Sequence, residues 1–282
     1  MKKSKVKTIE KSQDRLDVLK RIEQFEKEGR FNDDVEIDAP ANPIKPNEVD
    51  YINKKLSSKF MTFLANRLGK MYFEMMIKKR KFIIKEVTGI ENAQDVKGGA
   101  IVTCNHFNIR DNYVVYRCLK PTFKRHQYLY KVIKECNYTN FKGVVRIMMR
   151  HANTLPLSSN YETMKSFYNG VEKLLNRGEK ILIYPEQAMW WNYKKPRPFK
   201  KGAFQIASKF NKPILPVFIT MKDSDVVDDD GFLIQEYYVH FLPPIYPDEN
   251  LSQAENTQKM CETNYNLWVK TYEDFYNTKL VY

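Results

Sequence analysis

From residue 82 onward, short apolar runs alternate with longer stretches of helical periodicity, and no other feature restricts the fold as much. Such alternation is typical of a layered α/β domain with a largely parallel central sheet flanked by helices. We predict strands at Phe82–Val87, Ala100–Cys104, Gln127–Val132, Thr154–Leu157, Lys180–Tyr184, Ile214–Thr220 and Tyr237–Leu242. We predict helices near residues 112–119, 141–150, 161–177, 202–210 and 251–276.

The first 81 residues are predicted to form two segments outside this domain. Residues 1–50 have the composition of a charged tail, either a solvated helix or partly disordered, followed by a linker that contains Pro40, Pro43 and Pro46. Residues 51–81 have the pattern of a basic amphipathic helical segment that faces a membrane. The α/β domain is then expected to comprise residues 82–282.

The helical segment has two interpretations. Its apolar stripe is followed directly by the basic run Lys78–Lys81, a combination that suits a helix lying on an anionic membrane. A helix packed against the domain explains the stripe equally well, because amphipathicity shows only that one face is buried. The stripe consists of Leu56, Phe60, Phe63, Leu64, Leu68, Met71, Tyr72, Met75 and Met76.

The charge of the chain indicates an anionic partner. The formal net charge is +13, and residues 51–86 alone carry ten basic and two acidic side chains. A nucleic acid and an acidic membrane surface are the two obvious partners for such a protein. The sequence has no helix-turn-helix, zinc-finger or RNA-recognition signature, so we expect a membrane surface and no nucleic acid. A non-catalytic protein that binds an anionic surface or a nucleic acid is the less favoured alternative.

The four cysteines show neither disulfide nor metal-ligand spacing. This pattern favours a reducing, cytoplasmic compartment and no bound metal. No stretch reaches the roughly 18 apolar residues of a transmembrane helix, and the charged start of the sequence does not resemble a signal peptide. We therefore expect a cytoplasmic protein, peripheral on the inner face of the cell membrane.

The first motif with chemical content follows the predicted strand that ends at Cys104. Asn105 and His106 come directly after the strand, and Asp111 lies five residues beyond the histidine. An aspartate can hold one imidazole nitrogen protonated, so that the other nitrogen can accept a proton. A structural hydrogen bond is the plain alternative for an isolated His–Asp pair. Cys104, on a buried strand, is interpreted as an apolar filler.

A second polar motif follows another strand. Pro185 ends the apolar run 180–184 and leaves Glu186 at its carboxyl end. Ligands of open α/β sheets bind at the carboxyl ends of the strands. We therefore expect His106, Asp111 and Glu186 to converge on one site.

These motifs resemble those of the glycerolipid acyltransferases, the family of 1-acylglycerol-3-phosphate acyltransferase. That family carries a His-x4-Asp block, a Pro-Glu block after an apolar strand and a later Pro-Val block. The three appear here in order as His106–Asp111, Pro185–Glu186 and Pro213–Val217. Residues 87–92 and 199–204 resemble the family less closely, and the likeness covers about residues 82–220.

The resemblance implies acyl transfer from acyl-coenzyme A or acyl carrier protein to the hydroxyl of a lysophospholipid, without a cofactor. It implies that His106 is the general base and that Asp111 orients it. Glu186 would position the acceptor's hydroxyls or brace the site, and Asn105 or backbone amides would bind the oxyanion. The substrate-binding candidates are Glu186, Asn105, Pro185, Gln187 and, for phosphate, Arg146, Arg150, Lys200 and Lys201.

The chain departs from the family in two places. Gly-Thr-Arg-Ser usually follows Pro-Glu, whereas Gln187-Ala188-Met189-Trp190-Trp191 stands here. The two tryptophans would wall the site, touch lipid or pack in the core. An arginine thought to hold the acceptor's phosphate is expected near Ser158, where none occurs. A different acceptor, such as another lysolipid or an amino-acid lipid, is therefore an alternative.

Overall fold

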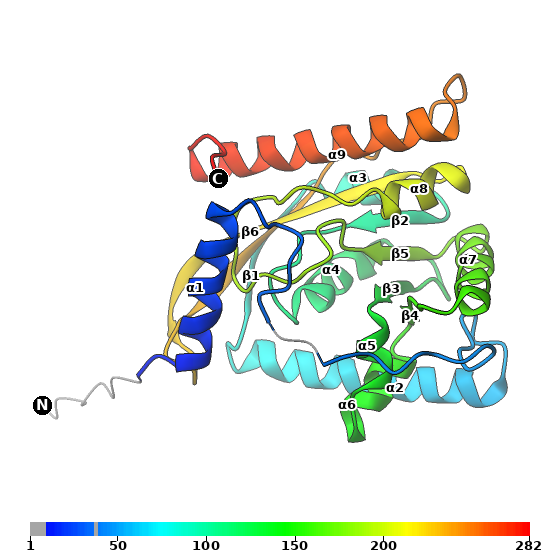
Figure 1. Cartoon of the computed structure of the whole chain (residues 1–282), viewed down its shortest axis with the longest axis horizontal. Helices are drawn as coiled ribbons and strands as arrows, with labels where there is room; N and C mark the ends of the chain where they lie inside the picture. The colour runs from blue at the N-terminus through cyan, green and yellow to red at the C-terminus, as the bar shows by residue number, and fades with distance from the viewer. Residues whose placement is uncertain (1–9, 37–38) are drawn as a thin grey trace, which may run out of the picture.

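Seven strands form one sheet in the computed structural model, which describes residues 10–36 and 39–282 (Figure 1). Residues 1–9 and 37–38 of the predicted tail and linker lie outside the described residues. The strands are β1 (Ile83–Thr88), β2 (Ala100–Thr103), β3 (Leu129–Ile133), β4 (Thr154–Pro156), β5 (Lys180–Ile183), β6 (Ile214–Val227) and β7 (Leu233–Phe241). The helices are α1 (Gln13–Lys27), α2 (Leu56–Lys78), α3 (Ile90–Asp95), α4 (Asp111–Leu119), the short 3-10 helix η1 (Lys120–Thr122), α5 (Glu135–Thr139), α6 (Gly143–His151), α7 (Tyr161–Asn176), α8 (Gly202–Lys209) and α9 (Gln253–Tyr276).

The strands lie in the order β1-β7-β6-β2-β5-β3-β4, and only β6 and β7 pair antiparallel. The predicted α/β class with a largely parallel sheet is therefore confirmed. All seven predicted strands are present, but β6 continues past Thr220 to Val227. After Met221, Lys222 and Asp223 end the apolar run, but the backbone pairing with β7 continues through them.

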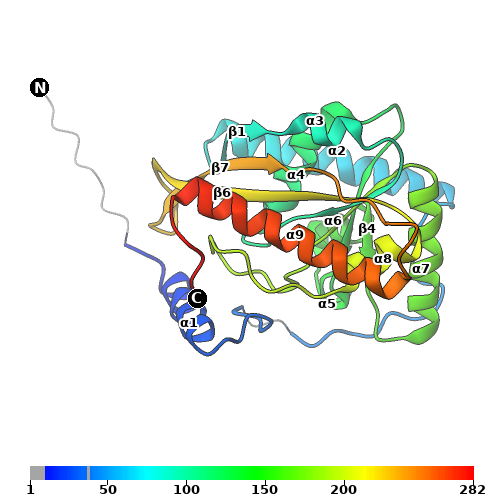
Figure 2. The same cartoon turned by 90° about the horizontal axis from the view of Figure 1, so that it is seen from above.

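Helices cover both faces of the sheet, as the view from above in Figure 2 shows. Alternate residues of each central strand face opposite layers. Val102 and Leu182 face the layer that includes α4, while Ile101 and Ile181 face the layer of α7 and α8. This packing buries β2 completely and fixes its carboxyl end in the middle of the molecule.

The N-terminal helix α1 packs on the domain through one apolar side. Val18 and Ile22 are buried against Trp190 and Trp191 of the loop between β5 and α8. The prediction of a solvated or partly disordered tail did not include this contact. The reason is that α1 is mostly charged, and two buried residues one turn apart are a weak signal in a sequence.

Helix α2 packs on the domain with one side and exposes apolar residues on another. Phe73, Met76 and Ile77 contact the apolar layer around α4. Ala65 and Gly69 are buried, and a Cβ atom on Gly69 would lie 2.5 Å from Cε of Met148 on α6. Several large side chains of the predicted stripe stay exposed, namely Leu56, Phe60, Phe63, Leu68, Met71, Tyr72 and Met75.

Helix α6 has no fully buried residue, and Val144, Val145 and Ile147 are exposed on it. We call the exposed apolar side chains of these two packed helices the α2–α6 face. In the described part of the chain, no helix combines the length and the apolar character needed to cross a bilayer.

Candidate active site

His106 and Asp111 form a hydrogen-bonded pair beyond the carboxyl end of β2. Nδ1 of His106 lies 2.7 Å from Oδ2 of Asp111, the first residue of α4. The aspartate is fully buried, whereas the histidine side chain is 21% exposed. Nδ1 therefore donates to the carboxylate. Among the hydrogen bonds of the described residues, none involves Nε2, so this nitrogen is the one that can accept a proton.

Asp111 is held by three further donors. Its Oδ2 accepts bonds from the backbone N–H groups of Phe107 (3.2 Å) and Asn108 (3.3 Å). Its Oδ1 accepts a 2.6 Å bond from the hydroxyl of Tyr184. Bonds of this kind stabilise a buried carboxylate in its charged form and fix its orientation. The carboxylate is thus held in a fixed orientation beside the imidazole.

Tyr184 is a site residue that the sequence analysis missed. Its ring stacks on the imidazole of His106, with ring centroids 3.9 Å apart and an angle of 16°. Burial, and then the charge of Asp111, raise the pKa of Tyr184 well above its ordinary value. The hydroxyl therefore remains a donor over the working pH range. Its place just before Pro185, at the end of an apolar strand, is the signal that identifies it.

Glu186 is buried and braces the site. Its Oε2 accepts a 3.1 Å bond from the backbone N–H of His106. Its carboxylate also accepts bonds from the backbone N–H (2.8 Å) and Nη2 (3.1 Å) of Arg197. Of the two roles expected for Glu186, this geometry supports bracing. Arg197, which the sequence analysis did not single out, is fully buried as its partner.

A tight turn follows the proline. The backbone N–H of Gln187 donates to the carbonyl of Tyr184 (3.1 Å), and Gln187 has a φ of 61°. Glycine adopts this left-handed conformation most easily, and glycine is the residue expected here from the family resemblance. The Pro185 carbonyl accepts a bond from the Lys200 backbone (2.8 Å), which brings the start of α8 next to the turn.

Asn105 does not face the space beside Nε2, which corrects the expectation that it binds the oxyanion. Its side chain exchanges two hydrogen bonds with the backbone of Ile219 on β6, at 2.9 and 3.0 Å. Asn105 therefore ties the end of β2 to its neighbour. Cys104 is fully buried, and burial followed by the charges of Asp111 and Glu186 raises the pKa of its thiol well above the ordinary value. A thiol in that state is not a nucleophile.

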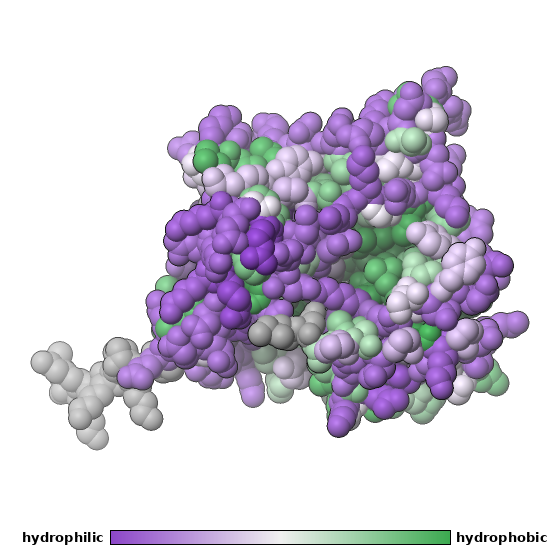
Figure 3. Space-filling view, in the orientation of Figure 1, coloured by the Kyte–Doolittle hydropathy of each residue, from purple (hydrophilic) through white to green (hydrophobic). Residues whose placement is uncertain are grey.

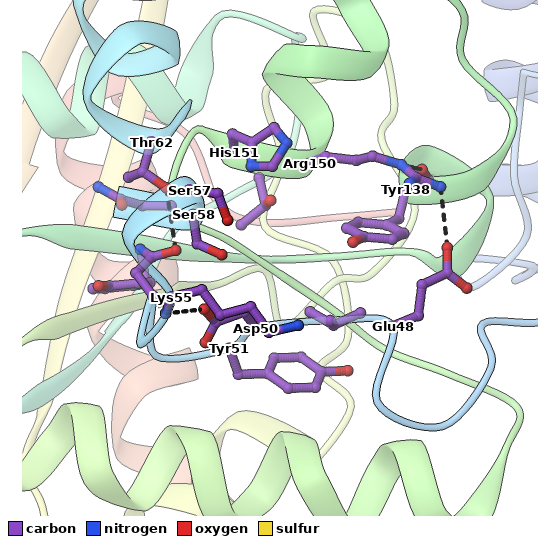
Figure 4. A pocket seen from close by; sticks show the side chains of 15 residues that line it. Glu48, Asp50, Tyr51, Lys55, Ser57, Ser58, Thr62, Tyr138, Arg150 and His151 are labelled. Carbon is purple, nitrogen blue, oxygen red and sulfur yellow. Dashed lines mark hydrogen bonds and ion pairs between the residues drawn. The ribbon is translucent and has the colours of Figure 1, made fainter. Parts of the chain in front are cut away.

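The basic candidates separate into two groups. Lys200 and Lys201 are exposed at the start of α8, close to the Pro185 turn. Arg146 is exposed on α6, and Arg150 lies in a separate pocket with a volume of about 200 Å³ (Figure 4). In that pocket Nη2 of Arg150 lies 3.3 Å from Oε1 of Glu48. The structure does not bring the two arginines of α6 to His106.

The segment after β4, at Ser158, contains no arginine and binds the carboxylate of Glu135 instead. The hydroxyl of Ser158 donates to Oε1 of Glu135 at 2.8 Å, and the backbone N–H of Ser159 donates to Oε2 at 3.0 Å. Ile44 donates to the same carboxylate from the linker (2.8 Å). Glu135 thus accepts bonds from three donors, two of them after β4 and one in the linker, at the point where the family resemblance led us to expect a base.

The two tryptophans after Gln187 belong to the core. Trp190 and Trp191 are buried in an apolar cluster with Val18, Ile22 and Phe31. Their packing rules out direct contact with lipid. On the face seen in Figure 3, mostly hydrophilic residues surround a hollow with apolar residues, which lies beside α7 and over β3 and β5.

Comparison with known proteins identifies a family and a structural neighbour. Residues 85–220 match the model of the family described as Acyltransferase, a range that contains all three sequence blocks. The crystal structure of the 1-acyl-sn-glycerophosphate (LPA) acyltransferase PlsC from Thermotoga maritima matches with 17% identity and a TM-score of 0.44, over 75% of this chain and 82% of that chain. No curated protein sequence matches the chain.

Proposed function

We propose that this chain, whose residues 85–220 match the acyltransferase family, acylates a lysophospholipid in phospholipid synthesis. The donor is a fatty acyl thioester of coenzyme A or acyl carrier protein. The acceptor is the free hydroxyl of a lysolipid such as 1-acylglycerol-3-phosphate. One observation carries the proposal: the 2.7 Å pair of His106 and Asp111 leaves Nε2 available at the carboxyl end of β2.

The pair performs the proton transfer that acyl transfer requires. Nε2 of His106 takes the proton of the acceptor hydroxyl, and Asp111 stabilises the imidazolium that results. The hydroxyl oxygen forms a bond to the thioester carbonyl carbon, and the carbon–sulfur bond then breaks. The sulfur leaves as a thiolate with the bonding electrons, and the proton on His106 passes to it or to water.

The other residues of the site support this step but neither transfer a proton nor form a bond in it. A simple thiol has a pKa of about 8.5, so the leaving group needs little acid assistance. Tyr184 and Glu186 hold the imidazole and its backbone, so the base is oriented before the acceptor arrives. The apolar hollow over β3 and β5 suits a fatty acyl chain (Figure 3).

The corner at Ser158 favours a second candidate acceptor. An arginine at this point would bind the phosphate of lysophosphatidic acid, whereas Glu135 binds the local donors here. The same chemistry on another lysolipid or an amino-acid lipid needs no such arginine. For a phosphate acceptor, the exposed Lys200 and Lys201 beside the Pro185 turn are the bases that we propose.

The α2–α6 face supports a reaction at a membrane surface. Phe60 is 65% exposed and Phe63 is 62% exposed, on a helix that also carries Lys59, Arg67 and Lys70. Apolar side chains with basic neighbours favour binding to the interface of an anionic bilayer. Lysolipids are held in that interface, so docking would bring the acceptor to the enzyme.

Thiol release tests the proposed function. The purified protein is given acyl-coenzyme A or acyl carrier protein with a panel of lysolipids, and His106→Ala is measured beside it. We expect release that depends on an acceptor and falls at least about 100-fold in the variant. Release with an acceptor other than lysophosphatidic acid would support the second candidate. Acceptor-dependent release that survives in His106→Ala would refute the assigned base.

A further inference from the structure

Arg197 is fully buried beside Glu186, in a place where an unpaired charge would be very costly. Its guanidinium lies 3.1 Å from Glu186, and the accessible surface of the residue is zero. Burial lowers the pKa of Arg197 from its ordinary value, and the Glu186 carboxylate opposes that change. A buried ion pair contributes little net stability compared with well-packed apolar residues. Its presence therefore suggests a role in orientation.

The Glu186–Arg197 pair controls the backbone on both sides of the His106 side chain. Glu186 accepts the bond from the His106 N–H at 3.1 Å. The same turn places the backbone N–H of Trp190 3.0 Å from the His106 carbonyl, which accepts its hydrogen bond. Any shift of the turn that contains Glu186 and Trp190 would therefore displace His106.

The N-terminal segment completes this arrangement. We call residues 13–36 the N-terminal cap. Nη1 of Arg197 donates to the Phe31 carbonyl at 3.0 Å, and the indole N–H of Trp190 donates to the Asp33 carbonyl at 2.9 Å. The Arg197 guanidinium also lies over the Trp190 ring, 4.7 Å from its centroid. Figure 1 shows α1 at the side of the domain, near the chain's carboxyl end.

The cap lies outside residues 85–220, the range that matches the acyltransferase family. The turn that it contacts is also where this chain departs from the family's usual sequence: Trp190 stands where a serine is usual and Met189 where an arginine is usual. The N-terminal cap and Trp190 fit together, because a buried indole needs both an apolar neighbour and an acceptor for its N–H. The cap supplies both.

We propose that Arg197 and the N-terminal cap act as one positioning unit for the acyl transfer. They hold the turn of Pro185–Trp190 in place, and this keeps the His106 backbone where its side chain can pair with Asp111. The inference rests on the proposed function. It makes α1 part of the working enzyme, although no residue of α1 touches the reacting atoms.

The test releases the cap without altering the α/β domain. Ile22→Asp places a charge in the buried contact between α1 and the tryptophans, while Leu19→Asp places the same charge on the exposed side of the same helix. We expect Ile22→Asp to shift tryptophan emission to longer wavelength and to lower kcat at least tenfold, with the KM for the donor changed less than twofold. Leu19→Asp should match the wild type in both readouts.

The outcomes separate this inference from the proposed function. The comparison uses full-length protein whose wild type shows release that depends on His106, so a failure of the proposed function is seen first. A red-shifted emission with an unchanged kcat would overturn the inference, because the cap would then be released without effect. An emission and a kcat both equal to those of Leu19→Asp would overturn it as well, because the cap would not depend on the packing described.

Arg197→Lys tests the other half of the unit. Lysine keeps the charge but cannot bind Glu186 and the Phe31 carbonyl together through a planar fork. We expect a lower kcat with a donor KM close to that of the wild type, and a larger loss for Arg197→Met. A folded Arg197→Lys enzyme with the wild-type kcat would overturn the role of the fork.

Discussion

The region around His106 and the α2–α6 face bury and expose side chains in opposite ways. The His106 region, made of His106, Asp111, Tyr184, Glu186 and Arg197, buries three charged groups and gives each of them partners within the chain. The α2–α6 face leaves large apolar side chains exposed, with Val144 at 68%. Both arrangements cost free energy in an isolated protein. The first is compensated inside the molecule, whereas the second is compensated only by a partner.

The largest effect is expected in the His106 region, whose buried charged groups have their partners inside the protein. Asp111→Asn keeps the size of the side chain but removes the charge that orients His106 and stabilises its protonated form. We expect kcat to fall at least about 100-fold. The measurement is thiol release at saturating donor, with the exposed Asp95→Asn as the matched control. Activity within a few-fold of the wild type would show that the pair is only structural.

The next effect should appear on the α2–α6 face and spare the chemistry. Phe60→Ser combined with Phe63→Ser removes two apolar groups that would otherwise leave water at a membrane. Burial of one such ring contributes about 1.5–3 kcal/mol. We therefore expect sedimentation with phosphatidylglycerol vesicles to weaken at least tenfold, at unchanged turnover of a soluble acceptor.

The control for the vesicle experiment removes apolar surface elsewhere. Val227→Ser combined with Tyr246→Ser alters exposed residues at the end of β6 and after β7. If the control binds vesicles as weakly as the α2 variant, exposed apolar residues contribute to vesicle binding wherever they lie on the surface. Equal binding by all three proteins would refute the membrane role of α2.

A smaller effect is expected from Tyr184→Phe, which keeps the ring on His106 and removes the hydroxyl from Asp111. We expect kcat to fall by about threefold to tenfold, because Asp111 keeps its other donors and a typical hydrogen bond contributes a net of about 0.5–1.5 kcal/mol. The loss should be equal at pH 7 and pH 9, since the raised pKa of Tyr184 keeps the hydroxyl protonated at both. A loss at one pH alone would show that the hydroxyl titrates.

The smallest effect concerns His240, a half-buried residue that belongs to neither region. His240 lies between the hydroxyls of Thr88 and Thr220, and burial lowers its pKa. The unfolded chain binds a proton near pH 6.5, where the folded protein does not yet bind one. The free energy of unfolding should therefore fall as pH drops below about 6.5. His240→Gln should show a smaller difference in Tm between pH 7.5 and pH 5.5, and an equal difference would contradict this assignment.

The sequence predicts the His106–Asp111 pair far better than the residues that hold it in place. His106 and Asp111 lie five residues apart after an apolar strand, so local pattern and spacing suffice to identify them. The contact of Arg197 with Phe31 spans 166 residues, and no short-range pattern records it. The sequence also predicts the apolar stripe of α2, but periodicity does not say which part of a stripe meets the domain and which part stays exposed.

Detection of the acylated product tests the central claim most directly. Wild type and His106→Ala are incubated with acyl-coenzyme A and vesicles that contain several lysolipids, and the diacyl products are measured by mass spectrometry. The account predicts one or more diacyl products from the wild type and at least about 100-fold less from the variant. Equal product from both proteins, or none from a folded wild type with either thioester donor, would contradict it.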